Sequence, residues 1–297
     1  MARRTWAPAY LVAIAAIASV LLTAGGAAAH RADTSSVDWL SFGNTVDQNR
    51  FSSLTQIQPG NLGQLGRAFT VDLNKFIPGI KKGQQNYPIV VNGVMYVTTG
   101  DDQVFAVNAT NGTLLWHYAP NNVATFKNFG IVANRGVAYC DNTVFLLTLD
   151  MTIVALNPAT GAQIERVPIS NAVPGAQANY GYSETSAPIC ADHHLIVGAA
   201  GSEYGARGFV MAYKTPSLAP AWPGPFWTIP PNDTEWRTAA RVVGGGVVWT
   251  PTTVDPTTDT LYIGTGAATP PYYPTLRPGN DPRTDSLIAI NLVTGQM

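Results

Sequence analysis

The feature that most restricts the fold of this chain is an internal repeat. Each copy reads as an apolar strand, a tight turn and a second apolar strand, and several copies end in an Ala-x-Asn-x-x-(Thr or Asn)-Gly turn. The copies are 92–112, 142–161, 194–213 and 260–295, with insertions in the later ones. Repeated strand pairs of this kind are typical of propeller blades, because radial repetition leaves only short, protected sheet edges. The sequence therefore predicts an all-β protein, a β-propeller of which about four blades are visible.

Alanines and tryptophans mark the repeat. Trp116 and Trp222 follow the strand pairs of the first and third copies, and we expect each ring to wedge between neighbouring blades. The second copy, 142–161, carries Glu165 and Arg166 at the equivalent place. No long helical periodicity follows residue 29, in agreement with an all-β fold. The alanines that anchor the second strands are Ala106, Ala155, Ala212 and Ala289.

Composition excludes some partners. The net charge is −1 and charged residues make up 12% of the chain, against about 25% in an average globular protein. A chain with this balance has no basic footprint for nucleic acid. After the N-terminal segment there is no second hydrophobic stretch, so we expect no membrane span in the mature protein.

The N-terminal segment has the pattern of a secretory signal peptide. Arg3 and Arg4 precede an apolar run from Ala9 to Leu22, and small residues ending at Ala29 follow it. The run is short for a membrane anchor and is followed by an Ala-x-Ala cleavage pattern. We therefore expect a signal peptide over 1–29, a propeller domain over 30–297, and a periplasmic or secreted protein.

Two cysteines, Cys140 and Cys190, occupy corresponding places in successive copies of the repeat. Export permits a disulfide. A disulfide, however, needs a short Cα–Cα separation, and we expect corresponding places in neighbouring blades to lie farther apart. The sequence thus favours two buried thiols.

The stretch Gly198 to Gly208 holds four glycines, one carboxylate (Glu203) and one guanidinium (Arg207) between two apolar strands. Glycine lets a backbone turn tightly or approach a ligand closely. By its local chemistry the stretch is either a plain hairpin or a place where Glu203 helps to hold a hard cation.

Five motifs, in this order, give the chain a resemblance to a known family. From 37 to the end it resembles the quinoprotein alcohol dehydrogenases, including the methanol dehydrogenase large subunits. The motifs are Asp38-Trp39-Leu40-Ser41-Phe42-Gly43-Asn44, Ala133-Asn134-Arg135-Gly136, Thr185-Ser186-Ala187-Pro188, Gly201-Ser202-Glu203-Tyr204-Gly205 and Gly244-Gly245-Gly246-Val247-Val248-Trp249.

The resemblance implies an eight-bladed propeller of about twice this length, present here in its N-terminal part. It also implies pyrroloquinoline quinone (PQQ), calcium, an alcohol or sugar hydroxyl as substrate, and a cytochrome c-like electron acceptor. PQQ is a planar tricarboxylate, which suits a guanidinium partner and an aromatic floor. By the same resemblance Glu203 is a calcium ligand. The PQQ-binding residues that it implies are Gln85, Arg135, Thr185, Ser202, Glu203 and Trp249.

Four places depart from the family pattern. Phe129-Gly130 stand where the family has two adjacent cysteines, and Gln85 stands where it has a glutamate. Val247 replaces a threonine, and Ala267 replaces a calcium-binding asparagine. The catalytic aspartate of the family is expected beyond Met297. Two hypotheses therefore stand: an exported PQQ-dependent dehydrogenase, or a propeller that has lost its redox site and acts as a binding or assembly module.

Overall fold

The structure is a computed structural model that describes residues 38–76, 84–120, 132–230, 244–278 and 280–297. The predicted signal peptide and the domain boundary at residue 29 lie outside these ranges. No helix within the described ranges has the length and apolar character of a membrane span.

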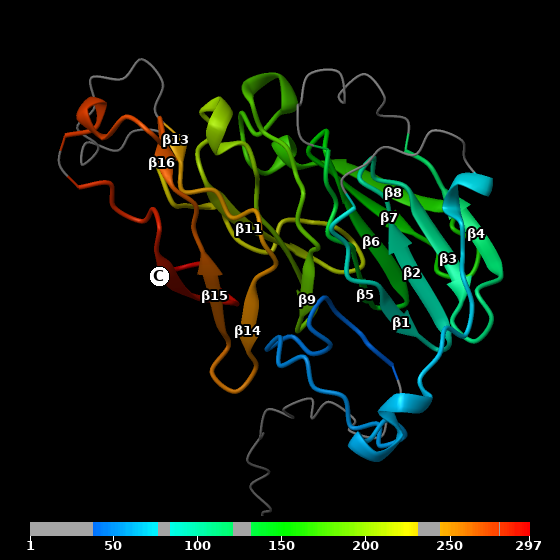
Figure 1. Ribbon diagram of the computed structural model, residues 1–297. Coiled ribbons are helices and arrows are strands. Elements are labelled where there is room, and N and C mark those ends of the chain that lie inside the picture. The colour runs from blue at the N-terminus through cyan, green and yellow to red at the C-terminus, as the bar shows by residue number, and fades with distance from the viewer. Residues whose placement is uncertain (1–37, 77–83, 121–131, 231–243, 279) are drawn as a thin grey trace, which may run out of the picture. The chain divides into compact units, whose positions relative to one another are not determined.

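Antiparallel sheets follow one another along the chain, as the repeat predicts (Figure 1). Three of them have four strands and one has three, and we call them blades 1 to 4. The prediction of an incomplete all-β propeller with about four visible blades is confirmed. Blade 1 contains β1 (Ile89–Val91), β2 (Val94–Thr98), β3 (Val104–Asn108) and β4 (Leu114–Tyr118); blade 2 contains β5 (Val137–Cys140), β6 (Thr143–Thr148), β7 (Thr152–Leu156) and β8 (Gln163–Pro168); blade 3 contains β9 (Ile189–Ala191), β10 (His194–Val197), β11 (Phe209–Lys214) and β12 (Phe226–Trp227); blade 4 contains β14 (Thr253–Asp255), β15 (Thr260–Gly264) and β17 (Leu287–Asn291).

Short elements join these sheets. Two strands form a small separate ladder, one before blade 4 in the sequence and one between β15 and β17. The helical turns of the described residues are all of the 3-10 type. These elements are β13 (Gly244–Gly245), β16 (Ala268–Thr269), η1 (Pro59–Gln64), η2 (Leu73–Lys75), η4 (Ile169–Asn171), η5 (Ala178–Tyr180), η6 (Ser202–Tyr204) and η7 (Pro274–Leu276).

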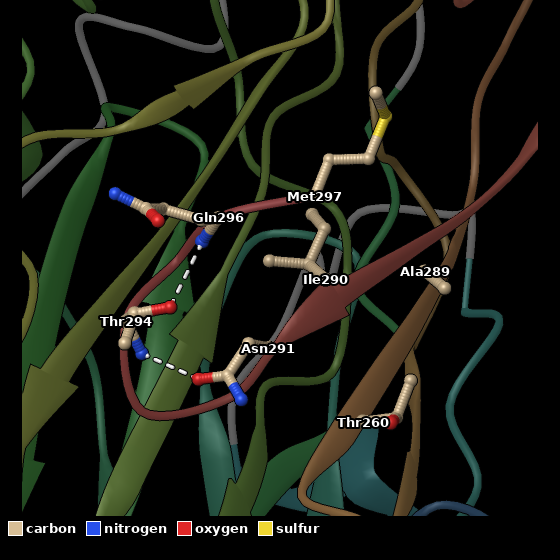
Figure 2. Close-up of a pocket in the computed structure, with 7 residues that line it drawn as sticks. All are labelled: Thr260, Ala289, Ile290, Asn291, Thr294, Gln296 and Met297. Carbon is tan, nitrogen blue, oxygen red and sulfur yellow. Dashed lines mark hydrogen bonds between the residues drawn. The ribbon is translucent and has the colours of Figure 1, made fainter.

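The repeated Asn-x-x-x-Gly turn has one geometry in blades 1, 2 and 4. The asparagine carbonyl accepts the glycine N–H at 2.8 Å for Asn108 and Asn157 and at 2.9 Å for Asn291. Each asparagine Oδ1 also accepts a backbone N–H from inside the turn, at 2.8 to 3.1 Å. Figure 2 shows this turn after β17, where Asn291 accepts the N–H of Thr294. The repeat therefore conserves an Asx turn that ends in a glycine with positive φ.

Tryptophan links successive blades, as predicted. Trp116 of blade 1 donates its indole N–H to Pro158 O of blade 2 at 2.8 Å, three residues before Gly161. A Cβ on Gly161 would lie 2.5 Å from the Trp116 ring, so only glycine admits the indole. Trp222 of blade 3 repeats the arrangement against Leu292 O and Gly295 of blade 4.

The expectation of two free, buried thiols is wrong, because Cys140 and Cys190 form a disulfide with a Cα–Cα distance of 6.3 Å. Two features bring them together. The first strands of blades 2 and 3, β5 and β9, contact each other. The strand registers also make Cys190 equivalent to Tyr139, one residue away from Cys140. A one-residue offset turns a strand side chain to the opposite face, so the two sulfurs face each other across the junction.

The core runs between the blades. One apolar cluster joins β1 to β4 with the inner strands of blade 2, and a second joins blades 2, 3 and 4. The segment 39–46 ties the first strand of blade 1 to that of blade 4: Trp39 exchanges backbone hydrogen bonds with Val90, and Val46 O accepts the N–H of Val254 at 2.9 Å. In blade 4, β17 alternates exposed and buried residues, so Ala289 is exposed whereas the corresponding Ala106, Ala155 and Ala212 are buried.

Candidate functional site

Most of the predicted site residues lie in the segments that lead into the first strands of the blades. Gln85, Thr185 and Trp249 each stand four residues before the start of a first strand, at Ile89, Ile189 and Thr253. The registers of the paired strands make these three positions equivalent to Asn134, the neighbour of Arg135. The fold thus repeats one position and fills it with a different polar or aromatic side chain in each blade.

Arg135 is the centre of the contacts in this region. Its Nη1 donates to the carbonyl oxygen of Thr185 at 3.0 Å and to its hydroxyl at 2.8 Å. Its guanidinium carbon lies 4.7 Å from the centre of a Trp249 ring, at cation–π distance. Thr185 is buried, whereas Trp249 is 42% exposed. Arg135, Thr185 and Trp249, which come from three different segments, therefore form one contiguous cluster.

The backbone that carries Arg135 is fixed by a buried carboxylate. Asp102, at the β2–β3 turn of blade 1, is fully buried and accepts Asn134 Nδ2 at 3.0 Å and the backbone N–H of Leu149 at 2.7 Å. Asn134 Oδ1 in turn accepts the N–H of Gly136 at 2.9 Å. Hydrogen bonds to a buried charge are about twice as strong as neutral ones. Asp102, which sequence reasoning missed, thus positions the loop on which Arg135 stands.

Glu184 is the second residue that sequence reasoning missed. It is completely buried, and its Oε1 accepts the backbone N–H of Ser186 at 2.7 Å. Its Oε2 has no hydrogen-bond partner among the described residues. Burial raises the pKa of Glu184 to about 7, although the N–H groups of Ser186 and Thr185 and the charge of Arg135 act in the opposite direction. No sequence signal marked this residue, because an acidic side chain in a loop segment is usually exposed.

The same charge acts on Arg135. Burial lowers the pKa of Arg135 from its usual value, and the negative charge of Glu184 opposes that effect. Arg135 and Glu184 do not form a salt bridge with each other, since neither takes part in the ion pairs of the described residues. Arg135 is therefore a half-buried cation that has no directly bonded carboxylate among the described residues.

Ser202 and Glu203 lie on η6, between β10 and β11, in a hairpin whose Ala199 and Ala200 hydrogen-bond to Val248 and Ser183. The side-chain oxygen of Ser202 is buried without a hydrogen-bond partner in the described residues, and Glu203 is exposed. η6 contacts β13 and β16, and Thr269 donates its hydroxyl to the carbonyl of Ser202. Ala267, directly before β16, is thereby placed next to the turn that carries Glu203.

The glycine-rich stretch is therefore a hairpin with a helical turn at its tip and a tightly packed base. Gly208 passes so close to the backbone of Gly246 that a Cβ would collide with its carbonyl oxygen. Gly208 N–H also donates to Gly245 O at 2.8 Å. This close approach fixes the strand that leads to buried Val247 and on to Trp249.

Gln85 joins the cluster through its backbone. Its N–H donates to Asn134 O at 3.4 Å, and Tyr87 N–H donates to Arg135 O at 3.2 Å. The Gln85 residue itself is exposed. A separate pocket beside β17 contains none of the predicted site residues (Figure 2); it is lined by Thr260, Ala289, Ile290, Asn291, Thr294, Gln296 and Met297.

The succession of antiparallel four-stranded sheets defines a class of protein, the β-propellers. The family model described as the β-propeller domain of PQQ-dependent glucose, ethanol and alcohol dehydrogenases matches residues 39–297. The chain belongs to this family.

Individual relatives agree with this membership. The dehydrogenase subunit of the quinone-dependent alcohol dehydrogenase of Gluconacetobacter polyoxogenes is 33% identical over 92% of this chain and 39% of its own length. The crystal structure of the quinohemoprotein alcohol dehydrogenase of Comamonas testosteroni is similar with a TM-score of 0.74 and 27% identity, over 87% of this chain and 40% of that one. A europium-containing methanol dehydrogenase gives a TM-score of 0.75 and 26% identity, over 87% of this chain and 47% of that one. The chain therefore spans less than half the length of these relatives.

The described residues fit PQQ better than they fit a metal ion. A guanidinium, a hydroxyl, an exposed indole face and the Ser202 hydroxyl, which has no hydrogen-bond partner among the described residues, suit a planar, carboxylate-bearing ring. No group of three or more His, Cys, Asp or Glu side chains that could hold a metal occurs in the described ranges. Calcium takes six to eight oxygen ligands, and Glu203 beside Ala267 offers one side chain.

Proposed function

We propose that this chain is the N-terminal part of an exported PQQ-dependent dehydrogenase that oxidises a primary alcohol or a sugar hydroxyl and passes electrons to a cytochrome c-like acceptor. The observation that carries the proposal is the cluster of Arg135, Thr185 and Trp249, because it joins three predicted PQQ contacts from separate segments. Periplasmic or secreted localisation, after removal of the signal peptide 1–29, belongs to the same proposal.

Each predicted site residue has its own task in this proposal. Arg135 pairs with a carboxylate or quinone oxygen of PQQ, and Thr185 and Ser202 give it hydrogen bonds. Trp249 is the surface on which the ring stacks, and Gln85 gives a neutral polar contact. PQQ, when bound, supplies the electron-accepting quinone.

Calcium is the metal that the resemblance implies, with Glu203 as its ligand in this chain. The name of one relative includes europium, so a trivalent lanthanide is the alternative ion for the same place. Because one exposed carboxylate is a weak site for either ion, no step of the reaction is assigned to the metal here.

The test is reconstitution of the full-length gene product with PQQ and Ca²⁺, followed by PQQ absorbance and dye-linked alcohol oxidation. We expect one PQQ per protein, and we expect Arg135→Ala to lose most of it. Arg67→Ala removes the same charge from an exposed position and serves as the control. Absence of PQQ uptake by the wild-type protein would refute the proposal.

A second candidate function is a redox-inactive propeller that serves as a binding or assembly module. It is favoured by Ala267, which cannot ligate a metal, and by the buried Val247, which has no hydroxyl. This candidate predicts a folded, full-length protein that takes up neither PQQ nor Ca²⁺, and the reconstitution experiment separates the two.

A further inference from the structure

Glu184 is the one buried acid of the site whose second oxygen has nothing to bond to in the described ranges. Its Oε1 is held by the N–H of Ser186, and Oε2 is buried without a partner. Burying a carboxylate that is only half satisfied disfavours its charged form. Glu184 is therefore balanced between its ionised and protonated states near neutral pH.

The charge of Arg135 favours the ionised carboxylate of Glu184, after burial and the backbone N–H groups of Ser186 and Thr185 have acted on it. Among the described residues Arg135 is the charged group that acts on Glu184, and it belongs to the segment before β5. The corresponding segments before β1 and β14 bring Gln85 and Trp249, which are uncharged. An anion that binds to Arg135 cancels the positive charge that favours the ionised carboxylate.

We propose that Glu184 takes up a proton when an anionic ligand, a carboxylate-bearing quinone, binds to Arg135. The proton comes from solvent and stays on the Glu184 carboxyl, and no covalent bond to the ligand forms. This inference rests on the proposed function, since PQQ is the anion. It gives Glu184 the role of a charge compensator that keeps the buried side of the site from holding two negative groups together.

The consequence is a defined pH dependence of binding. A group whose pKa is higher in the complex than in the free protein makes the complex tighter as pH falls. With the free carboxyl at a pKa of about 7 and the bound carboxyl protonated throughout this range, we expect PQQ affinity to rise about fivefold from pH 8 to pH 7 and about half a proton to be taken up per PQQ at pH 7.

The experiment is titration calorimetry of PQQ into the full-length protein, at constant Ca²⁺, in two buffers with different ionisation enthalpies. The difference in heat gives the number of protons taken up. Glu184→Gln should abolish the uptake and flatten the pH dependence, because glutamine keeps the backbone contact but cannot titrate. Glu165→Gln, on the exposed strand β8, removes the same charge away from the site and should keep both effects.

The outcomes are distinct. PQQ binding without proton uptake by the wild-type protein, or uptake that persists in Glu184→Gln, overturns this inference and leaves the proposed function standing. Absence of PQQ binding by the wild-type protein overturns both. Should Glu184→Gln not fold, the buffer dependence and the pH profile of the wild-type protein still decide.

Discussion

The disulfide between blades 2 and 3 allows the sharpest test of the energetics. Cys140 and Cys190 are 50 residues apart in the sequence, so the bond closes a long loop in the unfolded chain. The chain-entropy relation gives a loss of unfolded-state entropy that corresponds to about 4 kcal/mol of stability at 25 °C for a loop of that size. Strain and residual structure reduce such values in practice, and we expect Cys140→Ser with Cys190→Ser to cost about 2 to 4 kcal/mol.

The measurement is urea unfolding of the oxidised wild-type protein, the reduced wild-type protein and the double variant. Peptide mapping without reductant first establishes the Cys140–Cys190 bond. The reduced protein and the double variant should agree in their free energy of unfolding, because both lack the same cross-link. Their m-values should also exceed that of the oxidised protein, since an unlinked unfolded chain exposes more surface. A loss of less than about 1 kcal/mol, with the bond present in the wild type, would refute the reasoning.

Three further changes test the blade junctions and the site. Asp102→Asn leaves one of two buried N–H donors without an acceptor and should lower the unfolding free energy by about 2 to 3 kcal/mol, whereas an exposed control such as Asp259→Asn should stay within about 0.5 kcal/mol; equal effects in urea titrations would contradict the role of Asp102. Gly161→Ala forces a Cβ against the Trp116 ring at a positive φ, which should cost about 1 to 3 kcal/mol, and an unchanged unfolding midpoint would show that the ring is not seated there. Ala267→Asn adds an oxygen beside η6 and should tighten Ca²⁺ binding about tenfold, about 1.4 kcal/mol, with little effect on stability; calorimetry that shows unchanged affinity would separate position 267 from the metal.

The blades could be predicted from the sequence because their signals are local. An Asn-x-x-x-Gly turn is stabilised by its own side chain and backbone, so the pattern in 108–112 and 157–161 determines the same turn twice. The position of the tryptophans between blades could also be predicted. The ring packs against the glycine of the next Asn-x-x-x-Gly turn, and both residues can be recognised in the sequence.

The parts that were missed depend on contacts between blades. The sequence repeat placed Cys140 and Cys190 at corresponding positions. Their strands are in fact offset by one residue, and this offset determines which way each side chain points. The burial of Glu184 and Asp102 could not be predicted either, because an acidic residue in a loop segment is usually exposed. Their roles follow from the backbone N–H groups that the fold turns toward them.

The described site divides into two parts that differ in how much of the family pattern they keep. Around Arg135 the donors, the aromatic face and the supporting Asp102–Asn134 pair are all in contact. Around Glu203 the carboxylate is exposed and its neighbour Ala267 contributes no oxygen. Because the two parts rest on different segments, the lack of a second metal ligand beside Glu203 does not by itself remove the contacts predicted for PQQ. PQQ binding should therefore be measured without added metal. Uptake in the presence of chelator supports a cofactor site that rests on Arg135. Uptake only with Ca²⁺, lost in Glu203→Gln, supports Glu203 as a ligand of the ion.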